Sequence, residues 1–173
     1  MNDAKIIDFL KNKATQYNLS NPKNTASAIK RNIEDNILKQ ILPSAKRGKL
    51  EGNFGMSQST LAAAAVVLDT MPYTKDMLDF MFQTKDAVTY DDGTASSVRT
   101  LSGGDVSRTL VNTDLINRDG QGNEGSPDYN ALWVNQLKMI ADVLEGYDKY
   151  PTADLYPNPK FEKMLTGMRD LIA

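Results

Sequence analysis

The chain has 173 residues, of which 40% are hydrophobic and 24% are charged, and its formal net charge at pH 7 is -2. These values are typical of a soluble globular domain, and they exclude an overall basic field that would attract nucleic acid or anionic lipid. The chain contains neither cysteine nor histidine, which excludes disulfides, thiolate metal sites, cysteine nucleophiles and an imidazole base.

The first half of the chain shows helical periodicity. Apolar residues repeat at helical spacing in two segments that Asn21-Pro22 separates, namely Ile6, Ile7, Leu10, Ala14 and Tyr17, and then Ala26, Ile29, Ile33, Ile37 and Ile41. The second of these predicted helices lasts until Pro43, and the basic residues 44–51 are expected to form a loop. A third helix is predicted over residues 56–70 and a shorter fourth one over residues 75–84, with Pro72 between them.

The second half also favours helix, except over residues 85–103. Those residues are expected to form a loop, because the strand pattern Val88–Tyr90 would be isolated and an isolated strand is marginally stable. Helix is predicted to resume near Asp105. Ser126 and Pro127 have the residue types of an N-cap and a first helical position, and they predict a long helix that continues to about Tyr147. A connection over residues 150–159 then leads to a last helix with apolar residues at Phe161, Met164, Leu165, Met168 and Leu171. The predicted fold class is therefore all-α, built from antiparallel helical hairpins in a single domain over residues 1–173.

No apolar run has the length of a membrane span, because the most apolar one, residues 61–68, is short and rich in alanine. The N-terminus leads directly into the first predicted helix and lacks the apolar core of a signal peptide. We therefore expect either a cytoplasmic protein or an internal piece of an exported one, with no membrane and no nucleic-acid partner.

Two polar, glycine-rich stretches, residues 52–58 and 119–129, each lead into a predicted helix, and loops of this kind often carry function. Gly120, Gly122 and Gly125 have the G-x-G-x-x-G spacing of dinucleotide sites, but no buried strand precedes them, so a flexible loop before a capped helix is favoured. The acidic and amide residues of this loop also miss the EF-hand spacing, because Leu115 stands where the first carboxylate ligand should be. The sequence implies no cofactor and no metal site.

Three polar side chains in or beside these stretches are candidates for chemistry. Tyr129 falls in the first turn of a predicted helix, where the helix dipole favours negative charge, so it could transfer protons; alternatively its ring packs on the core while its hydroxyl contacts water. Asn53 could donate hydrogen bonds to a substrate carboxylate or cap a turn. Glu124 could accept hydrogen bonds from the start of the helix or orient a substrate hydroxyl. The basic side chains of residues 46–49 could attract an acidic ligand or form a solvated loop.

The stretch Gly52-Asn53-Phe54-Gly55-Met56-Ser57-Gln58, followed by an alanine-rich helix, resembles the Gly-Asn-aromatic segment of the heparinase II/III-like and related alginate lyases. The stretch from Asp119-Gly120 to Glu124-Gly125-Ser126-Pro127-Asp128-Tyr129 is similar to the Asp-Gly … Glu-x-Ser-x-x-Tyr stretch of the same family. The two stretches also occur in the family's order, and the resemblance spans about residues 25–150.

This resemblance implies part of an (α/α) toroid that cleaves uronic-acid polysaccharides, either alginate or a glycosaminoglycan, by β-elimination. Carried over by position, Asn53 would neutralise the uronate carboxylate, and Tyr129 would be the catalytic acid and could also be the base. Gln58, Glu124 and Trp133 would be substrate-binding residues. The implied partner is an acidic polysaccharide, and the implied location is periplasmic or extracellular.

Two departures from the family pattern qualify what this chain does alone. Family members generally also use a histidine, and by the resemblance Ser57 occupies the place where a histidine often follows the asparagine. The β-sandwich that normally follows the toroid is also missing, which is expected of a fragment of a larger toroid. Two alternatives therefore stay open beside the lyase, namely a non-catalytic carbohydrate-binding module and a helical interaction protein.

Overall fold

A computed structural model of the chain describes residues 3–19, 23–47, 55–83, 87–90, 99–102, 106, 117, 120–122 and 126–172. Most of these residues are helical, which confirms the predicted all-α class, although one short β-hairpin is also present. The chain divides into two compact units, Met1–Ile41 and Leu42–Ala173, where the sequence predicts a single domain. Among the described helices, none is both long and apolar enough to cross a membrane.

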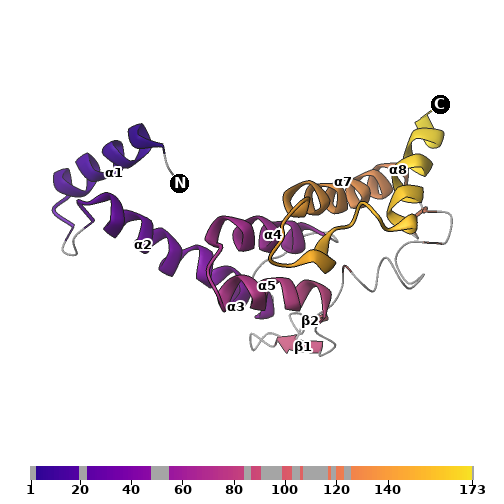
Figure 1. The fold of residues 1–173 in the computed structure, drawn as a ribbon, viewed down its shortest axis with the longest axis horizontal. Helices are drawn as coiled ribbons and strands as arrows, with labels where there is room; N and C mark the ends of the chain where they lie inside the picture. Colours follow the sequence, from indigo (N-terminus) through magenta and orange to yellow (C-terminus); the bar gives the residue numbers. More distant parts are fainter. Residues whose placement is uncertain are drawn as a thin grey trace. The chain divides into compact units, whose positions relative to one another are not determined.

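The first unit is built from two helices, α1 (Ala4–Gln16) and α2 (Ala26–Asn36), followed by the short 3₁₀ helix η1 (Leu38–Gln40) (Figure 1). The carboxylate of Asp3 caps α1 by accepting a hydrogen bond from the backbone of Lys5 at 2.9 Å. The helix ends where Asn18 adopts a left-handed φ of +46°, and the N–H of Leu19 then donates to the carbonyl of Ala14 at 3.1 Å. Both ends of α1 are therefore specified locally.

Two sequence predictions are wrong between residues 36 and 46. The helix predicted from residue 26 until Pro43 ends at Asn36, and η1 follows before helix α3 (Ile41–Lys46) begins. Residues 44–46, which were expected to belong to a loop, are therefore helical. Pro43 fits because it lies in the first turn of α3, where a backbone N–H has no partner within the helix.

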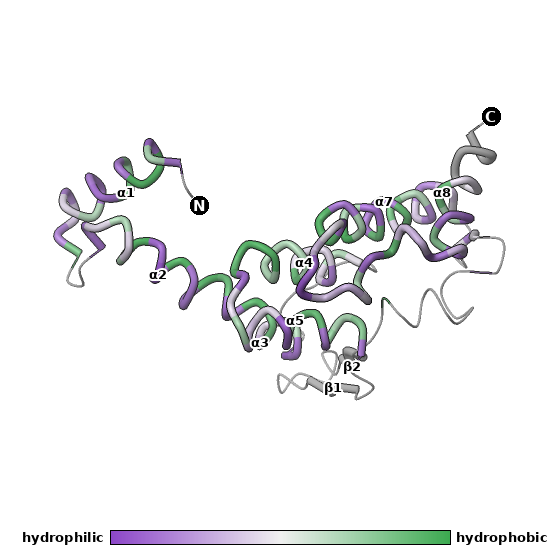
Figure 2. The backbone as a smooth tube through the Cα atoms, in the orientation of Figure 1, coloured by the Kyte–Doolittle hydropathy of each residue, from purple (hydrophilic) through white to green (hydrophobic). Residues whose placement is uncertain are grey.

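The second unit is organised around α4 (Met56–Leu68), which packs against both α5 (Tyr73–Phe82) and α7 (Pro127–Leu144) (Figure 1). Figure 2 shows that α4 is hydrophobic along much of its length. Ala62, Ala64 and Ala65 are buried, and their small side chains let the neighbouring helices approach closely. The buried hydroxyl of Thr74 donates to the carbonyl of Ala65 at 2.9 Å and joins the end of α4 to the start of α5.

The prediction of a loop over residues 85–103 is wrong at residues 87–90 and 99–102, which form strands. Strand β1 (Ala87–Tyr90) pairs antiparallel with strand β2 (Arg99–Ser102), and Ala87 lies opposite Ser102 while Tyr90 lies opposite Arg99. The sequence pattern identified the first strand, but its partner lies about ten residues further on and carries no strand signal of its own. The helix expected near Asp105 lies mostly outside the described residues, although Val106 is helical and fully buried.

The C-terminal part consists of α7, the 3₁₀ helix η2 (Pro151–Ala153) and α8 (Pro159–Ile172), which packs against α7. The predicted start of α7 is confirmed, because Ser126 occupies the N-cap position and Pro127 the first helical position. The Ser126 side chain, however, makes no capping hydrogen bond. The predicted core positions Phe161 and Met164 of α8 are both buried.

Candidate functional site

The first three turns of α7 present a stripe of side chains that differ in exposure. Tyr129, Trp133 and Gln136 follow one another at spacings of four and three residues, so they share one face of the helix. Tyr129 is 47% exposed and Trp133 only 5%. The phenol of Tyr129 is therefore accessible to a ligand, and it lies near the N-terminus of an 18-residue helix, where negative charge is stabilised.

The start of α4 lies against this stripe at Gln136. Gly55 has a φ of +89°, and a Cβ atom there would lie only 2.5 Å from the Cβ of Gln136. One turn later, the hydroxyl of Ser59 donates to Oε1 of Gln136 at 2.9 Å. The glycine is required both by its left-handed backbone and by this close approach.

The far end of α4 lies beside the segment that follows α7. Asp69, the C-cap of α4, accepts hydrogen bonds from the Tyr147 hydroxyl at 2.7 Å and from Nζ of Lys149 at 2.5 Å. The N-terminal end of α4 thus lies beside the middle of α7. The C-terminal end of α4 lies beside the residues that follow α7. The two helices therefore run in the same direction, and the N-terminal end of α4 lies toward the end of α7 that carries Tyr129.

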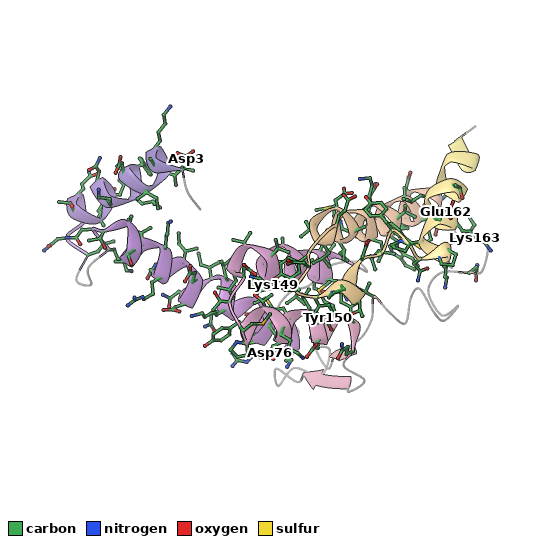
Figure 3. All side chains as sticks on the ribbon, in the orientation of Figure 1. Asp3, Asp76, Lys149, Tyr150, Glu162 and Lys163 are labelled. Atoms are coloured by element: carbon green, nitrogen blue, oxygen red, sulfur yellow. The ribbon has the colours of Figure 1, made fainter. Side chains whose placement is uncertain are left out.

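The second glycine-rich loop contacts α7 and α8 through its glycines. A Cβ at Gly122 would overlap the side-chain oxygen of Asn130 and would lie 3.1 Å from the ring of Trp133. Gly120 has a φ of +90°, and a Cβ there would lie 2.6 Å from the backbone carbonyl of Lys163 on α8, a residue labelled in Figure 3. Close packing against α7 and α8 therefore accounts for these two glycines.

The five predicted site residues have different outcomes. Asn53 and Glu124 lie outside the described residues. Tyr129 is accessible, as described above. Gln58 is 8% exposed and its Oε1 accepts a hydrogen bond from the Ser57 hydroxyl at 3.0 Å. Gln58 and Trp133 therefore offer little surface to a substrate, and their substrate-binding roles stay predictions.

Sequence reasoning overlooked the contact of Ser59 with Gln136. Gln136 lies among apolar residues at helical spacing, which favours reading it as part of an apolar helix face. Its polar amide within that face, seven residues after Tyr129, was the available signal, because a half-buried amide needs a hydrogen-bond partner.

Three tyrosines outside this stripe, Tyr147, Tyr150 and Tyr156, are bound to carboxylates. Three aspartates each accept a hydrogen bond from one tyrosine and one lysine: Asp69 from Tyr147 and Lys149, Asp79 from Tyr150 and Lys75, and Asp142 from Tyr156 and Lys138. Burial, followed by the hydrogen bond to Asp69, raises the pKa of Tyr147 to about 12. These phenols are therefore held in the protonated state and join residues 147–156 to α4, α5 and α7; Figure 3 shows Lys149 and Tyr150 on this segment.

The described residues contain no group of three or more acidic side chains that could hold a metal ion. No protein-family model, no curated protein and no solved structure matches the chain.

Proposed function

We propose that this chain is the helical domain of a polysaccharide lyase that acts on uronic-acid polysaccharides, either alginate or a glycosaminoglycan, by β-elimination. Asn53 and Tyr129 are its reacting pair, and the domain belongs to an (α/α) toroid of the heparinase II/III-like type. Glu124 supports the substrate near Tyr129. The accessible phenol at the start of α7 is the group that performs the proton transfer.

One observation carries this proposal: the described ends of both glycine-rich loops contact the same part of α7. Gly55 contacts Gln136, and Gly122 contacts Asn130 and Trp133. Residues 130 and 136 are about 9 Å apart along the helix axis. Asn53 precedes Gly55 by two residues, and two residues of chain span at most about 7 Å. Both loops can therefore reach the part of α7 that follows Tyr129, and we place the substrate there.

The chemistry requires three events at the uronate ring. A base removes the C5 proton, the C4–O bond breaks as the C4–C5 double bond forms, and the departing oxygen takes a proton. The side-chain amide of Asn53 donates to the uronate carboxylate and stabilises the negative charge that develops there, as an oxyanion hole does. A phenolate at Tyr129 removes the C5 proton and the resulting phenol donates it to the departing oxygen, so one side chain balances both transfers in a chain without histidine.

The test is to incubate the chain separately with alginate, heparan sulfate and hyaluronan and to follow the ultraviolet absorbance of the unsaturated uronate product. Tyr129→Phe removes the phenolic oxygen that takes the C5 proton and passes it to the departing oxygen, so we expect kcat to fall by about 10²- to 10⁴-fold. Asn53→Ala removes a donor to the developing charge and is expected to lower kcat by about 10²- to 10³-fold.

Tyr17→Phe is the matched control, because Tyr17 is 65% exposed and belongs to the first unit. The lyase activity of this variant should equal that of the unchanged chain. Activity that survives Tyr129→Phe would refute the role of that phenol. Binding of an oligosaccharide in calorimetry without product would favour the carbohydrate-binding module, and neither binding nor product would favour the helical interaction protein.

A further inference from the structure

The first unit contains an apolar cavity that the lyase proposal does not use. It lies between α1 and α2 and has a volume of about 420 Å³. Its walls are mainly aliphatic, with Leu10 and Ala14 from α1 and Ile29 and Ile33 from α2. Small-molecule sites typically have volumes of about 300–1,000 Å³ and a mostly apolar lining with a few polar groups. The size and the lining of this cavity both meet that description.

The described lining of the cavity carries positive charge. Among its described residues, Lys13 and Lys23 are the charged ones, none is acidic, and the polar residue Asn32 adds an amide. Within the described part of the chain, neither lysine has a carboxylate partner, whereas nearby Asp8 pairs with Lys11 and Asp35 with Lys39. Two half-buried lysines without a counterion beside an aliphatic cavity favour an anionic occupant.

The ammonium group of Lys13 is held in place at the cavity. Its Nζ lies 5.7 Å from the ring centroid of Phe9 and 5.8 Å from that of Tyr17, and it donates to Oε1 of Gln16 at 2.9 Å. Cation–π contacts of this length fix the position of the charge without neutralising it. Lys13 can therefore still pair with a ligand carboxylate.

We infer that this cavity binds a single-chain amphiphile with one carboxylate group, of the fatty-acid type, with its tail among the aliphatic side chains and its carboxylate at Lys13 and Lys23. A second copy of the unit fits less well, because residues 1–41 carry seven Lys and Arg against four Asp and Glu and two such units repel. A uronic-acid chain also fits less well, since its hydroxyl groups would have no hydrogen-bond partners along an aliphatic wall. The inference is independent of the proposed lyase activity, because no residue of the second unit takes part.

The test is calorimetric titration of the full chain with dodecanoate below its micelle concentration. We expect saturable binding at one site that weakens as salt is added. Decanoate, with two fewer methylene groups, should bind about 15-fold more weakly, because each buried methylene contributes about fourfold in affinity. Dodecyltrimethylammonium has the same tail and the opposite charge, so it should bind much more weakly than dodecanoate.

Three variants locate the site. The double variant Lys13→Gln, Lys23→Gln should weaken dodecanoate binding several-fold. The double variant Lys5→Gln, Lys11→Gln makes the same change in charge outside the cavity and should leave dodecanoate binding unchanged. Ala14→Leu projects additional side chain into the cavity and should abolish binding. Circular dichroism establishes that each variant retains its helices, and the two lysine variants remain informative if Ala14→Leu does not fold.

Four results would overturn the inference. They are no binding of dodecanoate, equal binding of the cationic amphiphile, equal losses in the two double-lysine variants, and binding to vesicles of anionic phospholipid without binding of monomeric dodecanoate. The last result would identify a membrane-surface site in place of a cavity for a single molecule.

Discussion

Tyr150 illustrates how a buried phenol stabilises this protein. Its side chain is buried, and its hydroxyl donates to Asp79 at 2.8 Å. Burial and then this hydrogen bond raise the pKa of Tyr150 above the ordinary value of 10.0. At Asp79, burial acts to raise the pKa, but hydrogen bonds from Lys75 and Tyr150 outweigh it, so the pKa lies below the ordinary 3.8. The protonated phenol and the ionised carboxylate are therefore the forms that the fold stabilises.

We predict that Tyr150→Phe lowers the free energy of unfolding by about 1 kcal/mol near neutral pH, since one hydrogen bond to a partly exposed carboxylate is lost. The raised tyrosine pKa contributes stability below pH 10 that is lost as the pH rises through the higher pKa of the folded state. The lowered aspartate pKa contributes stability above pH 3.8 that is lost as the pH falls through the lower pKa of the folded state. The stability of the variant should therefore fall less steeply than that of the unchanged chain at both extremes.

Urea unfolding at a series of pH values measures this effect. Tyr156→Phe is the control, because Tyr156 also donates to an aspartate, Asp142, but both partners are exposed and the loss should be smaller. Equal losses in the two variants, or an unchanged alkaline slope in Tyr150→Phe, would contradict the assigned role of burial.

At the scale of elements, the contact between α4 and α7 depends on a glycine. Both Gly55 and Gly146 have positive φ angles, +89° and +69°, but only Gly55 faces a neighbour, because nothing lies within 4 Å of a Cβ at Gly146. We predict that Gly146→Ala costs about 1 kcal/mol from backbone strain alone. Gly55→Ala should cost more, because its methyl group must also displace α4 from Gln136.

The difference between these two alanine variants measures the close approach of the helices. Chemical denaturation gives the free energies of unfolding, and near-ultraviolet circular dichroism of Trp133 reports any change in packing around α7. Equal losses would show that the contact between Gly55 and Gln136 contributes nothing to stability.

The sequence predicted those elements whose boundaries depend on local chemistry. The start of α7 followed from Ser126-Pro127, and Pro72 correctly separated α4 from α5. The break at Asn36 was missed because the apolar repeat continues through it, and the β-hairpin was missed because pairing of residues 87–90 with 99–102 is not a local property.

The same distinction applies to the candidate site. Tyr129 could be placed in the first turn of a helix from sequence, and the structure has it there. The burial of Gln58 and Trp133 and the contact of Ser59 with Gln136 depend on how α4 packs against α7, for which the periodicity of a single helix contains no information. Contacts between helices were therefore harder to predict than the position of a residue within its own helix.

At the scale of the whole chain, the two units differ in the size of their cores. The buried apolar residues of the first unit are Ile7, Ala14 and Ile29, at least among its described positions. In the second unit, Leu61, Leu137 and other large side chains are fully buried. Domains of about 40 residues rarely bury enough surface to be stable alone. The first unit should therefore open more readily than the second.

We predict that amide hydrogen exchange is faster in α1 and α2 than in α4 and α7, because local opening of a small core needs less free energy than global unfolding.

If the cavity between α1 and α2 binds dodecanoate, saturating ligand should slow exchange in these two helices and leave exchange in α4 and α7 unchanged, since a ligand stabilises only the state that binds it. Mass spectrometry of peptides from quenched samples separates the two units, and the Lys13→Gln, Lys23→Gln variant should lose much of the ligand effect. Equal exchange rates in the two units would contradict the first prediction, because the units would then unfold as one cooperative body. Slower exchange in α4 and α7 on adding dodecanoate would contradict the second prediction, because the ligand would then act beyond the first unit.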